Sequence, residues 1–297
     1  MRRDLVLAVV TLLSLALLAF ILPTYHQGNF ARIMVLAVFA MGYNFLFGYA
    51  GLLSLGHALF FAAGLYGFGL SADAFGLVPA LMLGVVAALL VTTLVGGLAL
   101  RTRGVAFMIV TLMFAQAGYL TLLYFGAITG GDEGFVVSKE VRSLFLSDDA
   151  RYWAAFGLFA CALLAKLALV NSWLGQLWVA VRENEARTSL LGYNTSAIKF
   201  SAVLLSGLYA GLAGAAYAAL FGYVGASFAT VQYSILPLLW VLVGGVSTVL
   251  GPFVGTLAMF YLIDLAGDYT DAHMLVAGIA LLIVVLFARR GLMGLVK

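Results

Sequence analysis

The amino-acid sequence predicts an all-α polytopic membrane protein with about ten transmembrane helices. Three observations predict this class. First, 65% of the 297 residues are hydrophobic and only 9% are charged, whereas a soluble domain carries roughly 25% charged residues. Second, apolar runs that approach the bilayer-spanning length of about 20 residues recur along the whole chain. Third, lysines and arginines concentrate in alternate connections between these runs.

Ten apolar runs are the predicted spans. They cover residues 5–22, 33–48, 57–71, 78–100, 105–125, 152–170, 200–223, 234–250, 253–266 and 273–288. The first run is longer than the core of a signal peptide, roughly 7–15 residues, and no small-residue cleavage site follows it, so we expect it to be retained. The four prolines, Pro23, Pro79, Pro237 and Pro252, lie at or near predicted ends, where a residue that breaks helix interiors is tolerated.

The basic residues predict that both termini lie in the cytoplasm, because Lys and Arg favour cytoplasmic connections. The residues expected on that side are Arg2, Arg3, Arg101, Arg103, Arg182, Arg187, Lys199, Arg289, Arg290 and Lys297. Fewer are expected outside, namely Arg32, Lys139, Arg142 and Arg151. Lys166 lies near the cytoplasmic end of its span, and we expect its side chain to snorkel to the surface.

The length fits a single transmembrane domain over residues 1–297, with no soluble domain attached. Two connections are long. The outer loop 126–151 is polar and acidic, whereas the inner loop 171–199 mixes apolar and charged residues. Leu177, Val181, Leu190 and Leu191 recur among the charges of the inner loop. This pattern predicts one or two short amphipathic helices at the membrane surface.

Three clusters of glycine have two possible interpretations, either close packing between helices or breaks within helices. They lie within residues 42–69, 207–225 and 244–255. Small residues let membrane helices approach closely, whereas non-helical backbone at membrane depth survives only inside protein or around a cavity. We expect packing in the second cluster and breaks at 48–57 and 244–252.

The sequence has no pattern typical of an enzyme. The three histidines are far apart, and there is no HExxH, GxSxG or phosphate-binding GxxxxGK[ST] motif. The single cysteine, Cys161, can form neither an internal disulfide nor a metal site. We therefore expect no catalytic residue, metal or cofactor in this chain, and any ATP hydrolysis in a separate subunit. The net charge of +3 is too small to indicate a nucleic-acid partner.

Polar side chains inside the predicted spans are candidates for a translocation pathway, because such groups are costly in lipid and usually face the bundle interior. They are Asn44, Ser54, His57, Thr111 and Gln116. For His57, a role in helix capping or packing is the alternative to contact with a ligand. The scarcity of carboxylates at this depth argues against a proton-coupled pump and allows a neutral or zwitterionic solute.

Five stretches of sequence occur in a fixed order, and together they form a pattern specific enough to indicate a family. They are YN with GYAGLLSLGH within 43–57, TRGVAFMIVTL at 102–112, TGGDEG at 129–134, VRENE at 181–185 continuing to Leu191 and Gly192, and GGVSTVLGP at 244–252. Together they resemble the LivM-type permeases of branched-chain amino acid ABC transporters, over most of the chain.

The resemblance implies a permease subunit of an ATP-driven ABC importer for small polar solutes, with branched-chain or other hydrophobic amino acids as the expected substrates. The partners it implies are a second related permease, two ATP-binding cassette subunits and an extracytoplasmic solute-binding protein. It also implies a multi-pass protein of a bacterial or archaeal cytoplasmic membrane.

The resemblance also assigns two groups of residues. Those of the ATPase-coupling motif are Arg182, Glu183, Asn184, Glu185, Arg187 and Gly192. Arg187 stands where the motif has a second alanine, and Gly192 lies one residue further from Glu185 than the motif has it. In the outer loop, the residues expected to dock the binding protein are Gly130, Gly131, Asp132 and Glu133.

The alternative function is a self-sufficient secondary carrier or channel for a small neutral solute such as urea or an amide. Such a protein needs no ATPase, so its inner loop 171–199 would be dispensable. A membrane-embedded enzyme is a third interpretation, and the lack of paired acids or of a histidine cluster disfavours it.

Overall fold

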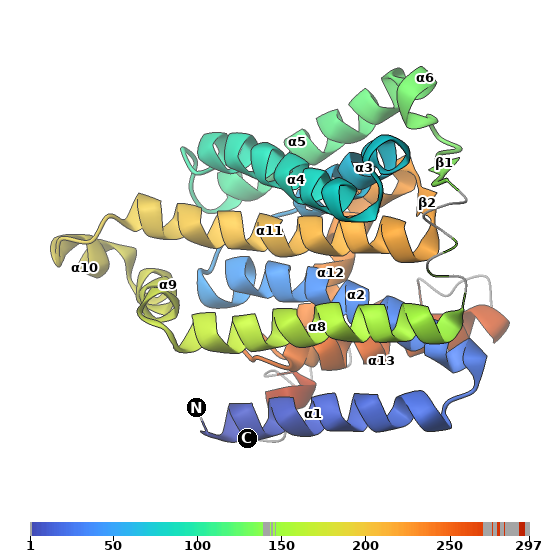
Figure 1. The fold of residues 1–297 in the computed structure, drawn as a ribbon. Helices are drawn as coiled ribbons and strands as arrows, with labels where there is room; N and C mark the ends of the chain where they lie inside the picture. The colour runs from blue at the N-terminus through green and yellow to red at the C-terminus, as the bar shows by residue number, and fades with distance from the viewer. Residues whose placement is uncertain are drawn as a thin grey trace.

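The computed structural model describes residues 2–138, 143, 145, 147–269, 275, 278, 279, 282 and 291–294. In this part of the chain the secondary structure is almost entirely helical, and the long helices lie side by side in one bundle (Figure 1). Seven described helices are long and apolar enough to cross a membrane, and two shorter apolar helices accompany them. The predicted all-α polytopic class is therefore confirmed.

The first five long helices follow the predicted order. They are α1 (Arg2–Ile21), α2 (Thr24–Asn44) with the π-helical extension η1 (Phe45–Tyr49), α3 (His57–Phe75), α4 (Leu77–Ala99) and α5 (Val105–Tyr124). Pro23 precedes α2 with φ −58°, a value its ring fixes and a first helical turn accepts. Gly76 alone separates α3 from α4, with φ +76° and ψ −176°, a conformation that glycine adopts without strain.

The remaining elements alternate long helices with short ones. They are α6 (Gly126–Thr129), β1 (Phe135–Val136), α8 (Asp148–Asn171), α9 (Trp173–Glu183), α10 (Glu185–Leu190), α11 (Thr195–Phe221), β2 (Tyr223–Val224), η2 (Ala226–Ala229), α12 (Val231–Gly244), α13 (Gly251–Tyr269) and η3 (Leu292–Gly294). β1 and β2 pair antiparallel and join the outer loop to the chain after α11. α9 and α10 are the short helices predicted within the inner loop 171–199.

Nine of the ten predicted spans coincide with helices, and the tenth, 273–288, lies largely outside the described residues. Lys139, Arg142, Arg289, Arg290 and Lys297 also lie outside them. Span 234–250 is shorter than predicted, because α12 ends at Gly244 and residues 245–250, which lie within the predicted break 244–252, are not helical. With 14 residues, α12 rises only about 21 Å, less than the hydrocarbon thickness of about 30 Å.

The irregular segment 222–230 precedes this short helix and runs along α3 inside the protein. Val224 and Ala229 are fully buried. A Cβ on Gly69 would lie 2.6 Å from the side chain of Val224, and the rings of Phe61 and Phe228 are 5.9 Å apart. Burial between helices allows this non-helical backbone to lie at membrane depth.

Close glycine contacts join α3 to α11, as predicted for the second glycine cluster. A Cβ on Gly214 would lie 2.0 Å from the carbonyl oxygen of Phe61, and one on Gly64 would lie 2.2 Å from that of Gly211. The core of the bundle is α2, where every residue from 33 to 46 is buried. A helix that is apolar on all sides is expected at such a central position.

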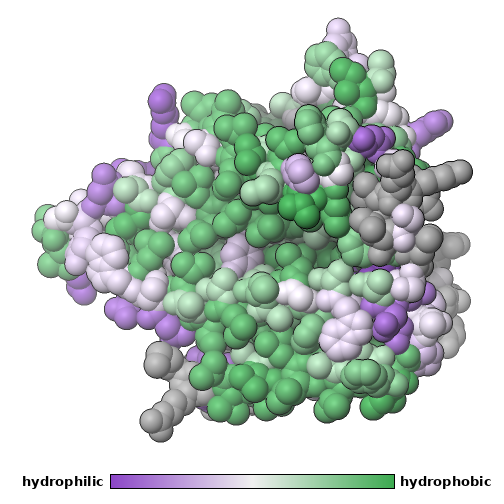
Figure 2. Space-filling view, in the orientation of Figure 1, coloured by the Kyte–Doolittle hydropathy of each residue, from purple (hydrophilic) through white to green (hydrophobic). Residues whose placement is uncertain are grey.

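The two ends of the bundle carry different elements, and we call them the inner end and the outer end. The inner end holds the N-terminus, α9 and α10, whereas α6, β1 and β2 lie at the outer end (Figure 1). Met293 lines a pocket with Arg3 and Asp4 at the inner end, and Arg101 and Arg103 line another there. Hydrophobic side chains cover the middle of the molecule and hydrophilic ones gather toward its ends (Figure 2). This arrangement agrees with the predicted location of both termini inside.

Candidate functional site

Two breaks in the helices meet near the inner end of the bundle. The first, residues 50–56, separates η1 from α3, and the second, 245–250, separates α12 from α13. Both breaks were predicted, and both are confirmed. Asn44, at the end of α2, binds the second break, because its Nδ2 donates to the Thr248 carbonyl at 2.8 Å and its Oδ1 accepts from the Ser247 amide at 3.2 Å. Its side chain is fully buried.

Ser247 has an unusual backbone conformation in the second break. Its φ of +59° makes it the one non-glycine residue with positive φ in the part of the chain that the structure describes. Such a conformation costs on the order of 1–3 kcal/mol and persists only where the surroundings impose it. The contact with Asn44 and the hydrogen bond that Ser247 Oγ donates to the Gly48 carbonyl, 2.7 Å, are part of those surroundings.

Lys166 of α8 lies beneath the same break and is fully buried. Its Nζ donates to the carbonyls of Thr248 and Val249 at 3.2 and 3.1 Å, and it lies 5.9 Å from the centre of the Phe45 ring. The prediction that Lys166 snorkels to the surface is therefore wrong. Non-helical carbonyls at this depth need donors, since an unsatisfied one costs several kcal/mol in a bilayer, and the ammonium group supplies them.

Arg182 connects α9 to both breaks. One nitrogen of its guanidinium donates to the Gly48 carbonyl and to Ser247 Oγ. Its side chain also packs on Gly51, where an added Cβ would lie 2.6 Å from Arg182 Cγ. The six residues that join α8, α9 and the two breaks form what we call the inner polar cluster. It consists of Asn44, Gly48, Lys166, Arg182, Ser247 and Thr248.

The other predicted coupling residues divide by role. Asn184 ends α9 and caps α10, because its Oδ1 accepts from the Arg187 amide at 2.8 Å. Glu185 pairs with Lys199 at 2.6 Å. This hydrogen bond, together with the charges of Lys199 and Arg103, holds the pKa of Glu185 below its ordinary value. Gly192, with φ +89°, lies in the turn that follows α10.

Glu183 and Arg187 are exposed on this pair of short helices. Leu190 and Leu191 are also exposed, at 88% and 72%, near the tip of α10 that projects beyond the bundle (Figure 1). Sequence reasoning placed these leucines on the membrane surface and missed them as contact residues. The sequence does hold a signal for exposed contact residues here, namely two adjacent leucines directly before Gly192. Adjacent residues point in different directions from a helix, so at most one of the two can face inward.

Four of the five predicted pathway residues lie close to one another, and Gln116 does not. Two of them accept hydrogen bonds from backbone amides of the first break: the Leu55 amide donates to Thr111 Oγ1 at 3.2 Å, and the Gly56 amide donates to Ser54 Oγ at 3.2 Å. The Ser54 carbonyl in turn accepts from the Tyr43 hydroxyl at 3.0 Å. Asn44 lies next to Tyr43 in α2. The side chains of Asn44, Ser54, His57 and Thr111 are all buried in this structure.

His57 begins α3 at a point where two helix N-termini meet. The Ala58 amide donates to Ser234 Oγ, in the first turn of α12, at 3.0 Å. The His57 ring stacks on Phe39 at 5.2 Å, and its Nε2 lies 3.4 Å from Ser206 Oγ. Its Nδ1 is buried without a hydrogen-bond partner. Two positive helix ends beside an imidazole favour an anionic group such as a carboxylate.

Gln116 lies exposed on α5. The same helix also exposes Ile109, Met113 and Leu120. An exposed amide at membrane depth is costly in lipid, so this face requires a polar neighbour.

The predicted docking residues for a binding protein form a tight turn at the outer end. Gly130 and Gly131 have φ +75° and +60°, values that glycine adopts without strain. Asp132 and Glu133 are exposed, and the carbonyl of Glu133 accepts from the Tyr223 hydroxyl at 3.2 Å. The turn therefore holds two carboxylates beside β2. Within the described residues, no three His, Cys, Asp or Glu side chains could together hold a metal ion.

Comparisons with known proteins agree on one family. The sequence model described as "Branched-chain amino acid transport system / permease component" matches residues 28–285. The high-affinity branched-chain amino acid transport system permease protein LivM of Escherichia coli K12 is 28% identical over 292 residues, which cover 89% of this chain and 69% of that protein. The protein of the same name from Salmonella typhimurium LT2 is 28% identical over 295 residues, with the same coverage. No solved structure gives a significant match.

Proposed function

This chain belongs to the family of branched-chain amino acid transport system permease components, and we propose that it forms the membrane path of an ABC importer for branched-chain amino acids. Family membership and the apolar helices make it a multi-pass permease of the cytoplasmic membrane. The observation that carries the proposal is the link through Arg182 of α9, which packs on Gly51 in the first break and donates to Ser247 Oγ in the second.

The proposed coupling begins at α9 and α10. Exposed residues at the end of α9 and along and just after α10 offer charged and apolar contacts to a cleft in an ATPase subunit, namely Glu183, Arg187, Leu190 and Leu191. Closure of the ATPase pair would move α9 and α10 as a rigid body. Arg182 would transmit that movement to the carbonyl of Gly48 and the hydroxyl of Ser247. Non-helical segments deform more readily than the helices beside them, so the two breaks would act as the inner gate.

The proposed solute is a zwitterion with an apolar side chain. The N-termini of α3 and α12, with His57 between aromatic rings, suit a carboxylate. The surrounding rings of Phe39 and Phe61, which lie 4.9 Å apart, suit a branched aliphatic group. Ser54 and Thr111 would offer further hydrogen bonds once the first break opens.

The proposed partners occupy separate surfaces. We assign the exposed face of α5 to the second permease, because it would shield Gln116 from lipid. The turn that carries Asp132 and Glu133 would receive the solute-binding protein outside the membrane. ATP hydrolysis is assigned to two ATP-binding cassette subunits docked at α10.

The test separates ATPase docking from coupling. The chain is co-expressed with its candidate ATPase subunits and second permease, and the purified complex is reconstituted in vesicles to measure ATP-dependent leucine uptake. With Leu190→Ser and Leu191→Ser together, we expect the ATPases to be lost on purification. With Arg182→Gln, we expect the ATPases to be retained and uptake to fall by at least about tenfold, a coupling loss of 1.4 kcal/mol or more. Arg151→Gln, at the outer end, is the charge-matched control and should change neither.

The carrier alternative predicts a different result. If the chain alone moves leucine or urea in vesicles, and removal of residues 173–192 leaves that flux unchanged, the chain is a self-sufficient carrier or channel. Retention of uptake by the Arg182→Gln complex would reject the proposed route of coupling while leaving the ABC assignment intact.

A further inference from the structure

A second basic region lies at the inner end, apart from the inner polar cluster. It is a cavity of about 640 Å³ between the α4–α5 connection and the start of α11. Its polar wall contains three cations, Arg101, Arg103 and Lys199, and one acid, Glu185. Since Glu185 pairs with Lys199 at 2.6 Å, the two arginines give the cavity an excess of positive charge. No described salt bridge engages either arginine.

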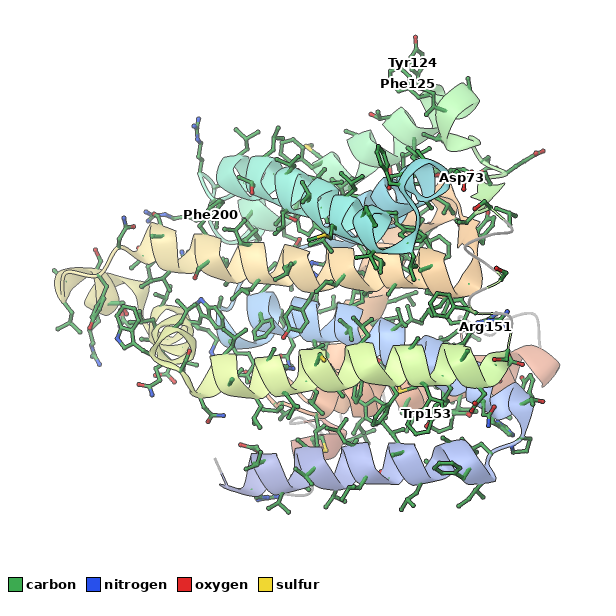
Figure 3. All side chains as sticks on the ribbon, viewed as in Figure 1. Asp73, Tyr124, Phe125, Arg151, Trp153 and Phe200 are labelled. Carbon is green, nitrogen blue, oxygen red and sulfur yellow. The ribbon has the colours of Figure 1, made fainter. Side chains whose placement is uncertain are left out.

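The other wall of the cavity is apolar and belongs to membrane-spanning helices. It includes Gly97 of α4, Leu100 directly after that helix, and Phe200 of α11. Phe200 lies in the second turn of α11 (Figure 3), and a Cβ on the neighbouring Gly96 would lie 4.0 Å from its ring. The cavity is therefore amphipathic, with cations on one side and apolar groups on the other.

The apolar wall continues along the exposed surface of α4. Leu90, Leu94 and Leu98 are 66%, 61% and 42% exposed. A Cβ on Gly97 would meet no atom within 4 Å, so the surface is open beside these leucines. Residues spaced by three, four and seven positions lie on one helix face, so Leu90, Leu94 and Gly97 lead along α4 to Arg101.

We propose that this cavity binds the phosphate headgroup of an anionic phospholipid of the inner leaflet, with an acyl chain along α4. Guanidinium groups match phosphate oxygens in charge and geometry, and basic pockets between helices on the cytoplasmic side suit such headgroups. The continuous apolar surface distinguishes a lipid from a soluble anion, which would use only the arginines. The bound lipid would link the α4–α5 connection to Lys199 and hence to Glu185 at the start of α10.

The proposal is tested on the full chain purified in detergent, by native mass spectrometry with added dioleoyl phosphatidylglycerol. Dioleoyl phosphatidylcholine is the zwitterionic comparison, and glycerol 3-phosphate is the soluble headgroup. We expect Arg101→Gln and Arg103→Gln each to weaken phosphatidylglycerol binding about fivefold, the effect of about 1 kcal/mol per basic residue. Arg187→Gln removes the same charge at the same end but outside the cavity, and should leave binding unchanged. Glu185→Gln removes the only acid of the cavity and should strengthen it.

Several results would overturn the proposal. Equal binding of phosphatidylcholine would show that the arginines recognise no headgroup charge. Competition by glycerol 3-phosphate as effective as that by the lipid itself would identify a site for a soluble phosphate. If the double change Arg101→Gln and Arg103→Gln weakens retention of the ATPase subunits but not lipid binding, the cavity receives a protein instead. The proposal expects Glu185→Gln to bind phosphatidylglycerol more strongly. Misfolding of the arginine variants would only weaken binding, so it cannot produce this combination of results.

Discussion

At the scale of single residues, two cations donate hydrogen bonds beside the helix breaks. Lys166 is fully buried and donates to two carbonyls of the second break. Arg182 is exposed and donates to the Gly48 carbonyl of η1 and to Ser247 Oγ of the second break. Neither forms an ion pair within the described residues. Ionisable groups buried among membrane helices are rare and costly, so the hydrogen bonds of Lys166 to two backbone carbonyls are what makes its burial tolerable.

Replacement of Lys166 by methionine tests its role in the second break. The change leaves the carbonyl of Val249 without this donor, whereas the carbonyl of Thr248 keeps its hydrogen bond from Asn44 Nδ2. An unpaired buried carbonyl costs about 1–3 kcal/mol, so we expect a loss of that size, measured as a fall in the unfolding temperature of the detergent-solubilised protein. Lys199→Met is the control, because its pair with the partly exposed Glu185 is worth less than about 1 kcal/mol. Equal effects of the two changes would contradict this role.

At the scale of elements, breaks and close packing use glycine in different ways. In the breaks, Gly51 and Gly245 have φ of +73° and +125° and turn the chain. In the α3–α11 contact, the glycines are helical, and their lack of a side chain lets the two helix backbones approach closely. The π-helical extension η1 adds a further irregularity before the first break, and such segments occur often at functional sites.

The α3–α11 contact gives a prediction with an internal control. A methyl group at Gly64 would lie 2.2 Å from a carbonyl oxygen of α11, so Gly64→Ala must separate the two helices. We expect a loss of about 1–3 kcal/mol, the usual cost of overpacking. Gly157 of α8 has no atom within 4 Å of an added Cβ, so Gly157→Ala should be neutral or slightly stabilising. Thermal unfolding of both variants in one detergent would compare them, and a tolerated Gly64→Ala would refute the close contact.

At the scale of the whole molecule, the positions of exposed polar groups indicate which surfaces face lipid, which face a partner and which face water. α1 and α5 are the least buried of the long helices. Of the two, α5 carries the exposed amide of Gln116 within its apolar face. That difference favours α5 as the side on which the second permease lies, with α1 facing lipid.

Gln116→Leu tests this assignment. The side-chain amide of Gln116 forms no hydrogen bond with another element in the described part of the chain. The stability of the isolated chain should therefore change by less than about 0.5 kcal/mol. Co-purification of the second permease should fall, because its polar contact is lost. Leu120→Ala, on the same exposed face, should have a smaller effect on that co-purification. An unchanged yield of the partner with Gln116→Leu would place the second permease on another face.

The orientation of the chain can be tested by thiol labelling. Cys161 is first replaced by serine, and single cysteines are then introduced as Glu133→Cys at the outer end and Arg187→Cys at the inner end. With both termini inside, a membrane-impermeant maleimide should label position 133 in intact cells and position 187 only after permeabilisation. The reverse pattern would invert every loop assignment.

The sequence by itself determined the membrane class, the order of the helices, both breaks and the family. These features depend on composition, on the length of apolar runs and on local motifs such as GYAGLLSLGH and GGVSTVLGP, which neighbouring residues encode. It also located the groups Ser54 and Thr111, because polar side chains within apolar runs are visible without any knowledge of contacts.

Only the tertiary structure decided where polar side chains point. Whether Lys166 reaches the surface or a carbonyl depends on residues 248 and 249, more than eighty positions further along the chain. The same holds for Arg182, which the resemblance assigns to the coupling motif and whose contacts with Gly48 and Ser247 join segments far apart in the sequence. Hydropathy reports the solvent that a segment prefers, whereas hydrogen bonds between distant segments decide which backbone leaves the helix.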